Sequence, residues 1–106
     1  MDVGSMCVDS GEVKDVRQMG ITHADFFRLL PRAMGENPYE LNDLTVRATL
    51  EAGTVLISLG EEQERRLSEH VIMPYTDVTF LFCGVPTEVR AAFERYFHMR
   101  YMRGLG

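Results

Sequence analysis

The clearest hydrophobic pattern in the chain is an alternation over residues 44–51. Apolar side chains at Leu44, Val46, Ala48 and Leu50 are separated by polar ones, which is the period of a strand with one buried face. Glu51-Ala52-Gly53 then provides a three-residue turn with a glycine for the left-handed position, and residues 54–59 return as a second strand. This segment predicts a first β-hairpin.

A second hairpin is predicted from residues 65–73 and 76–83. Residues 60–63 are interpreted as the turn that precedes it, and Pro74-Tyr75 as the turn inside it, because proline cannot donate to a β-ladder. Residues 61–67 carry enough charge to form a helical turn instead, so the start of the third strand stays open.

Helical patterns flank the two hairpins. Thr22-His23-Ala24-Asp25 is typical of a helix N-terminus, and the helix is predicted to stop or bend near Leu30, because Pro31 lacks the backbone donor. After residues 86–88, apolar side chains recur with the 3.6-residue spacing of a helix that runs to about Met102. These side chains are Val89, Ala92, Phe93, Tyr96 and Phe97.

This order of elements predicts an α+β fold. A helix, two β-hairpins forming a four-stranded antiparallel sheet and a C-terminal helix would place both helices on one face of the sheet. Residues 1–18 show no sustained period and are predicted to be a flexible leader. Residues 19–106 are predicted to form a single α+β domain.

Composition and charge exclude several classes of protein. The chain has 106 residues, 45% hydrophobic and 25% charged, which excludes an intrinsically disordered chain, and no apolar run approaches the roughly 20 residues of a membrane span. The formal charge of -5 argues against nucleic acid as a partner. Because the N-terminus resembles no secretory signal, we expect a soluble cytoplasmic protein of bacterial type.

The sheet face away from the helices is expected to be partly covered. It is predicted to carry Leu56, Ile72, Leu81 and Cys83, which is more apolar than a solvent face needs. The cover could be a second copy of the chain, another partner, a ligand, or residues 1–18 and 36–43. A second copy is favoured because closed homodimers are the commonest oligomers.

The C-terminal segment offers a second possible interface. Residues 85–106 hold four arginines and two glutamates, whereas residues 19–84 hold ten acidic and five basic side chains. The candidate interface residues here are Arg95, Tyr96, Arg100 and Tyr101, whose side-chain types are common in interfaces. The same positive charge also suits the C-terminal end of a helix without any partner.

Two candidate chemical sites are weak. His98 and Met102 share a helix face, beside Met99, and imidazole with thioether can hold copper, although packing is the simpler role for methionine. Cys83 and His70, oriented by Asp77, could form a thiol site, although Asp77 lies where a turn residue is expected. The two cysteines indicate neither a disulfide framework nor a zinc site.

The sequence contains no phosphate-binding glycine motif, and we expect no cofactor. The favoured function is a non-enzymatic domain that binds a protein or a small ligand, as a homo-oligomer or with a protein partner and without a membrane. The alternative is a small thiol-dependent enzyme or redox protein that uses Cys83 with His70. Metal binding through His98 and Met102 is the third hypothesis.

Overall fold

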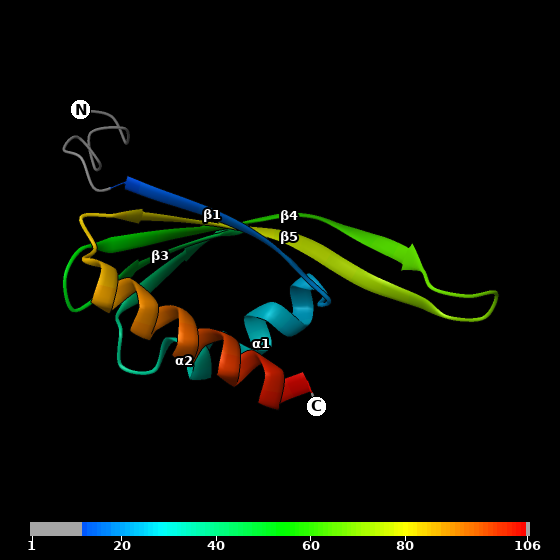
Figure 1. The fold of residues 1–106 in the computed structure, drawn as a ribbon. Coiled ribbons are helices and arrows are strands. Elements are labelled where there is room, and N and C mark those ends of the chain that lie inside the picture. Colours follow the sequence, from blue (N-terminus) through cyan, green and yellow to red (C-terminus); the bar gives the residue numbers. More distant parts are fainter. Residues whose placement is uncertain (1–11, 106) are drawn as a thin grey trace.

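A computed structural model describes residues 12–105 and gives them an α+β fold (Figure 1). The elements in chain order are β1 (Glu12–Met19), α1 (His23–Met34), β2 (Tyr39–Asn42), β3 (Thr45–Thr49), β4 (Thr54–Arg66), β5 (Ile72–Cys83) and α2 (Thr87–Leu105). The strands form one antiparallel sheet in the order β1-β5-β4-β3-β2. Both helices cover the same face of this sheet, which confirms the predicted class, but the sheet has five strands instead of four.

The prediction of a flexible leader was wrong for residues 12–18, which belong to β1. β1 pairs with β5 from Glu12 opposite Cys83 to Met19 opposite Thr76. The alternation was hidden because charged side chains at Asp15 and Arg17 occupy the helix-covered face between the half-buried Val13 and Met19. Residues 1–11 of the predicted leader, with Cys7, lie outside the described residues.

The prediction of a separate second hairpin over residues 65–83 was also wrong. Residues 60–63 do not turn: β4 continues through an irregularity between Leu59 and Glu62 and ends at Arg66. Pro74 and Tyr75 lie inside β5. A proline is tolerated there because β1 ends opposite Thr76, which leaves that part of β5 at an open edge. β2 lies in a segment for which no strand was predicted.

The ends of the helices agree in part with the sequence pattern. The Thr22 hydroxyl accepts a hydrogen bond from the Asp25 backbone N–H at 3.1 Å, as expected for the N-cap of α1. The helix continues through Pro31 to Met34 instead of stopping near Leu30. Ala33 and Met34 are completely buried, and this packing compensates for the lost backbone bond.

The first predicted turn is confirmed, including its glycine. Gly53 has a φ of 87°, which favours glycine. The turn is closed by a hydrogen bond from the Leu50 N–H to the Gly53 carbonyl oxygen at 3.0 Å. A side chain at this position would also meet the carbonyl oxygens of Cys83 and Gly84. The turn therefore brings Gly53, just before the start of β4, beside the end of β5.

The core lies between the sheet and the two helices. Aromatic rings from three elements meet in it: Phe26 from α1, Phe80 and Phe82 from β5, and Phe97 and Tyr101 from α2. The Phe97 ring centroid lies 5.3 Å from that of Phe80 and 4.7 Å from that of Tyr101. Neither helix in the described part of the chain is long and apolar enough to cross a membrane.

Candidate functional site

The candidate site is a two-stranded arm made of residues 61–75, in which β4 and β5 extend beyond the other strands (Figure 1). We call the remainder of the described chain the body. β3 pairs with β4 only as far as Ser58, and β1 pairs with β5 only as far as Thr76. Beyond these points β4 and β5 pair with each other alone among the described residues, out to Arg66 opposite Ile72.

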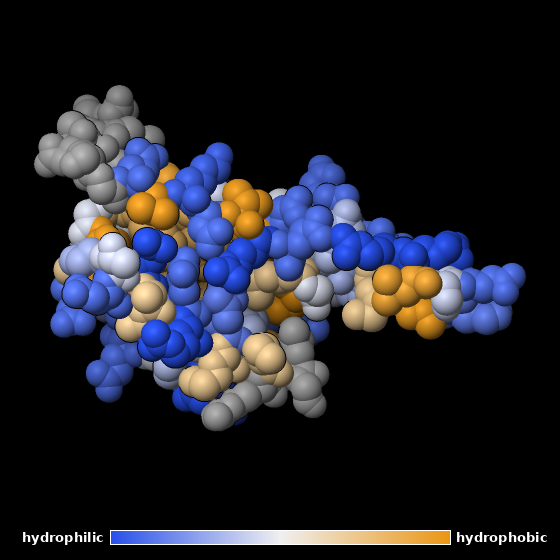
Figure 2. Space-filling model, viewed as in Figure 1, coloured by the Kyte–Doolittle hydropathy of each residue, from blue (hydrophilic) through white to orange (hydrophobic). Residues whose placement is uncertain are grey.

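The far end of the arm exposes large apolar side chains. Their exposed fractions are 58% for Leu67, 43% for Val71, 48% for Ile72 and 45% for Met73. Figure 2 shows this apolar surface near the end of the arm, next to strongly hydrophilic residues. Alternation along β5 puts Ile72 and Met73 on opposite sides of the arm, so both sides of this projecting element carry exposed apolar side chains. Exposed apolar surface on such an element is typical of a binding surface.

The body's sheet edges are protected against pairing, whereas the arm is open on both sides. In β1 the edge carries Lys14, and the charges of Asp15 and Arg17 face the helix-covered side, which is a common way to discourage strand addition. The other edge strand, β2, has only four residues and follows Pro38. An isolated two-stranded hairpin is marginally stable in water, so the arm is the element that gains most from a partner.

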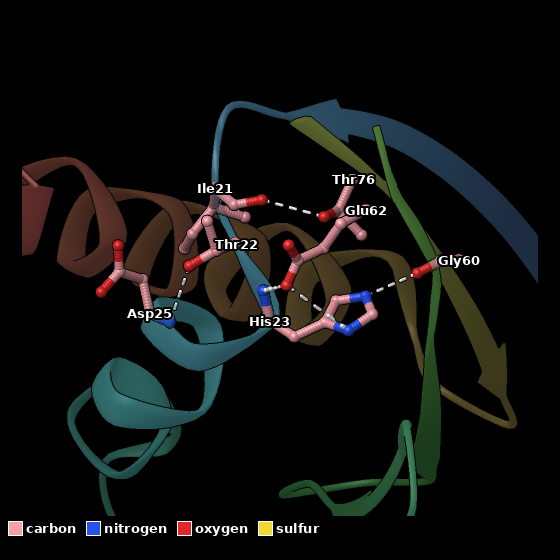
Figure 3. Close-up of polar contacts among 7 residues, drawn as sticks. All are labelled: Ile21, Thr22, His23, Asp25, Gly60, Glu62 and Thr76. Atoms are coloured by element: carbon pink, nitrogen blue, oxygen red, sulfur yellow. Dashed lines mark hydrogen bonds and ion pairs between the residues drawn. The ribbon is translucent and has the colours of Figure 1, made fainter. Parts of the chain in front are cut away.

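The base of the arm is fastened to the start of α1 (Figure 3). The His23 backbone N–H donates to Glu62 Oε2 at 2.8 Å, and His23 Nε2 lies 2.7 Å from the Gly60 carbonyl oxygen. Because a carbonyl can only accept, this geometry assigns the proton to Nε2. The Thr76 hydroxyl donates to the Ile21 carbonyl oxygen at 2.9 Å and is buried. These bonds set the direction in which the arm leaves the body.

A second group of contacts stiffens the arm just beyond its base. The Arg65 guanidinium lies 4.8 Å from the centre of the Tyr75 ring and donates to the Gln18 side chain. The Tyr75 hydroxyl donates to Gln63 Oε1 at 3.0 Å. The polar side chains near the base are thus satisfied, and the apolar end remains available for contact.

Some of the predicted interface residues are exposed, and others are buried. Leu56 and Leu81 face each other across β4 and β5 on the side away from the helices, and both are half-buried. Ile72 does not join them, because the alternation along β5 puts it on the same side as the core residue Val78. Its expected place on the outer face was therefore wrong, and it belongs to the arm.

The four candidate interface residues of the C-terminal segment do not form one surface. Tyr101 is only 2% exposed and its hydroxyl donates to the Phe26 carbonyl oxygen at 2.7 Å, so it is a core residue. Arg100 lies over the ring of the half-buried Tyr96, 5.0 Å from its centre. Arg95 is exposed. Of the four, Arg95 has the placement that an interface needs.

The residues of the alternative thiol hypothesis are far apart along the sheet. His70 lies in the turn at the end of the arm, with its side chain 89% exposed, whereas Cys83 is the last residue of β5 and is 5% exposed. Cys83 is also not a free thiol. The structure thus contradicts the pairing of His70 with Cys83, because a strand of 12 residues separates them.

A charged cluster lies where β1 meets α2. Arg17 Nε is 3.0 Å from Asp15 Oδ2. Burial, followed by the charge of Asp15, raises the pKa of Glu94 above its ordinary value. Burial, with a smaller effect of Arg17, lowers the pKa of His98. Within residues 12–105, no group of three or more His, Cys, Asp or Glu side chains is placed to hold a metal ion, and Met102 beside His98 is 73% exposed.

A pocket of about 400 Å³ lies between the end of α1, the turn after β3 and the first half of α2. Its wall includes Leu50, Phe93 and Tyr96, and Glu36 and Glu51 contribute carboxylates. Neither this pocket nor the arm was predicted from the sequence. The arm could have been suspected from Val71-Ile72-Met73, an apolar run that follows a strongly charged stretch.

Comparisons with known proteins give no relative from which a function could be transferred: no family model, no curated protein and no solved structure matches the chain.

Proposed function

We propose that this protein is a non-enzymatic interaction module that binds a protein partner through its arm. The observation that supports this function best is the exposed apolar end of the arm, formed by Leu67, Val71, Ile72 and Met73. Removing such side chains from water stabilises a complex by roughly 25 cal/mol per Å² of apolar surface, before the cost of association.

The attachment of the arm to the body supports the same function. The hydrogen bonds of His23 and Thr76 hold the base of the arm in one direction, so less conformational freedom is lost when a partner binds. Preorganisation of this kind raises affinity without adding contacts.

Site-specific photocrosslinking tests this function with a matched pair of positions. A photoreactive phenylalanine derivative is placed at Leu67 at the end of the arm or at Leu41 in β2, because these leucines are 58% and 55% exposed. In cells that naturally make the protein, we expect discrete crosslinked species from position 67 and none from position 41. Equal products from both positions, or none from position 67, would exclude the arm as the binding element.

The pocket beside α2 supports a second candidate function, the binding of a small ligand. Its aromatic wall and the carboxylates of Glu36 and Glu51 suit a small aromatic amine. Nuclear magnetic resonance titration with phenethylamine is expected to shift signals of Phe93 and Tyr96. The Ala92→Phe substitution, which fills part of the pocket, should abolish these shifts.

A further inference from the structure

We infer that the partner of the arm is a second copy of this chain, and that the arm of each copy lies on the exposed face of α2 of the other. This inference rests on the proposed function and names its partner. It also implies a closed dimer with two equivalent arm-to-helix contacts, since a twofold axis repeats each contact.

The exposed face of α2 carries several apolar side chains, although most exposed helix faces are polar. The exposed side chains among residues 87–102 are Thr87, Glu88, Ala91, Ala92, Arg95, Met99 and Met102, and the apolar ones gather toward the C-terminal end. Met99 is 38% exposed and Met102 is 73% exposed. Beside them lies a shallow groove of about 430 Å³ whose walls also include Arg17 and His98. Methionine side chains adapt readily to the shape of a partner.

The charges of the two surfaces are complementary. Residues 61–70 hold four glutamates and two arginines, whereas residues 85–106 hold four arginines and two glutamates. Both arginines of the arm are engaged within the arm or with the body, Arg65 with Tyr75 and Gln18, and Arg66 with the Glu69 carbonyl oxygen. Glu64 and Arg95 form no ion pair within the described residues, so each is available to the other copy.

The protected edges of the body favour this arrangement over pairing of sheets. The edge strand β1 carries Lys14, Asp15 and Arg17, and β2 is short, so a continuous sheet between the bodies of two copies is disfavoured. The arm and the face of α2 both carry exposed apolar side chains next to charged ones. An arm laid on α2 covers both at once.

A charge-exchange experiment on the full chain tests the inference. The Glu64→Arg and Arg95→Glu chains are prepared separately, and sedimentation velocity is measured at low salt for each chain, for their equimolar mixture and for the wild type. Each variant alone places like charges at both contacts and should dissociate at least tenfold more readily than the wild type. The mixture should regain association, because opposite charges then meet at both contacts.

The matched control is the pair Glu40→Arg and Arg47→Glu. These substitutions make the same charge changes at exposed positions on the sheet face away from the helices. They should leave self-association unchanged, and added salt should weaken association of the wild type. If the control pair disrupts association instead, the interface lies on the sheet face and the inference is wrong.

The outcomes separate the inference from the proposed function. One outcome is that Glu64→Arg weakens association, that Arg95→Glu does not, and that the mixture shows no recovery. In that case the arm binds a surface other than α2, and only the inference fails. If the wild type is monomeric at several hundred micromolar, a second copy is excluded as the partner. The proposed function then depends on photocrosslinking through position 67.

Discussion

At the scale of single residues, buried polar atoms connect elements that are distant in sequence. The Tyr101 hydroxyl in α2 donates to the Phe26 carbonyl oxygen in α1 at 2.7 Å. Burial, followed by the charge of Tyr39, raises the pKa of Tyr101 well above its ordinary value, which agrees with a hydroxyl that keeps its proton to make this bond. The bond therefore joins the two helices within the core.

We predict that Tyr101→Phe lowers the free energy of unfolding by about 1 kcal/mol, because a buried hydrogen bond is lost and the ring is kept. Urea denaturation of the full chain measures the change. The control is Tyr75→Phe in the arm, where the lost bond to Gln63 is exposed and the cost should be smaller. If both substitutions lower the free energy of unfolding equally, the buried bond of Tyr101 does not stabilise the fold more than the exposed bond of Tyr75.

His98 is predicted to make stability depend on pH. Burial among the rings of Phe80 and Phe97 lowers its pKa below the ordinary 6.5, so the folded state favours the neutral ring. Its contribution to stability is present above pH 6.5 and is lost as the pH falls through the lowered pKa. Since the ring is only half-buried, we expect less than about 1 kcal/mol.

Urea denaturation between pH 7.5 and pH 5 checks this prediction, with His98→Gln as the comparison. The variant should lose less stability than the wild type on acidification. Glu94, Asp15 and Arg17 also face this ring. Glu94 acts in the opposite direction, because its raised pKa means that its contribution is lost as the pH rises. An identical pH profile for the two chains would show that His98 is not responsible.

Sequence patterns identified core residues where a polar neighbour marked each alternate position. Leu44, Val46, Ala48 and Leu50 were predicted on one face of their strand. The last three are buried, whereas Leu44 precedes β3 and is exposed. Tyr101 was predicted at an interface because tyrosine is common in interfaces and in cores alike. Its position in the core depends on how α1 and α2 meet, which a local pattern does not contain.

At the scale of elements, the sequence predicted both helices and missed the length of β4. A turn was expected at Gly60 because glycine followed by charged residues is typical of a turn. The strand instead continues for six further residues to Arg66, and these residues show no alternation because neither face of the arm is covered by the core. β1 was missed for a related reason, since charges face inward at Asp15 and Arg17.

The contact between Glu62 and His23 at the base of the arm is predicted to stabilise both the fold and the arm. Glu62→Ala removes the acceptor of the first backbone N–H of α1, at His23, and should cost about 0.5–1 kcal/mol, as for the loss of a helix cap. Hydrogen exchange of amides in residues 63–73 should accelerate, because the arm is less firmly held.

The matched control for this prediction is Glu61→Ala, which removes the neighbouring carboxylate. Glu61 is exposed and forms no ion pair among the described residues, so neither stability nor arm exchange should change appreciably. Similar exchange in the two variants would mean that the Glu62 contact does not hold the arm.

At the scale of the whole molecule, the body and the arm have different roles. Every core residue of the described chain lies outside residues 61–75, so the arm adds nothing to the core. The sequence analysis did not predict this organisation, because a projecting element has no hydrophobic period of its own. The pocket beside α2 was equally hidden, since it is built from three separate segments.

This division predicts that the arm can be shortened without unfolding the body. Residues 64–74 are replaced by Asn-Gly, a favoured two-residue turn between the paired Gln63 and Tyr75. The free energy of unfolding should stay within about 1 kcal/mol of the wild type, because no buried apolar side chain is removed. Circular dichroism and urea denaturation measure the fold, and sedimentation velocity measures association.

A second variant separates the effect of the length of the arm from the effect of its apolar side chains. It keeps the full arm but carries threonine in place of Leu67, Val71, Ile72 and Met73. If the apolar end makes the contact, this chain should fold as the wild type does and should associate as poorly as the shortened one. Association at the wild-type level would show that the backbone of the arm, with its open edges, is sufficient for binding. Unfolding of the shortened chain would instead make the arm part of the structure that stabilises the body.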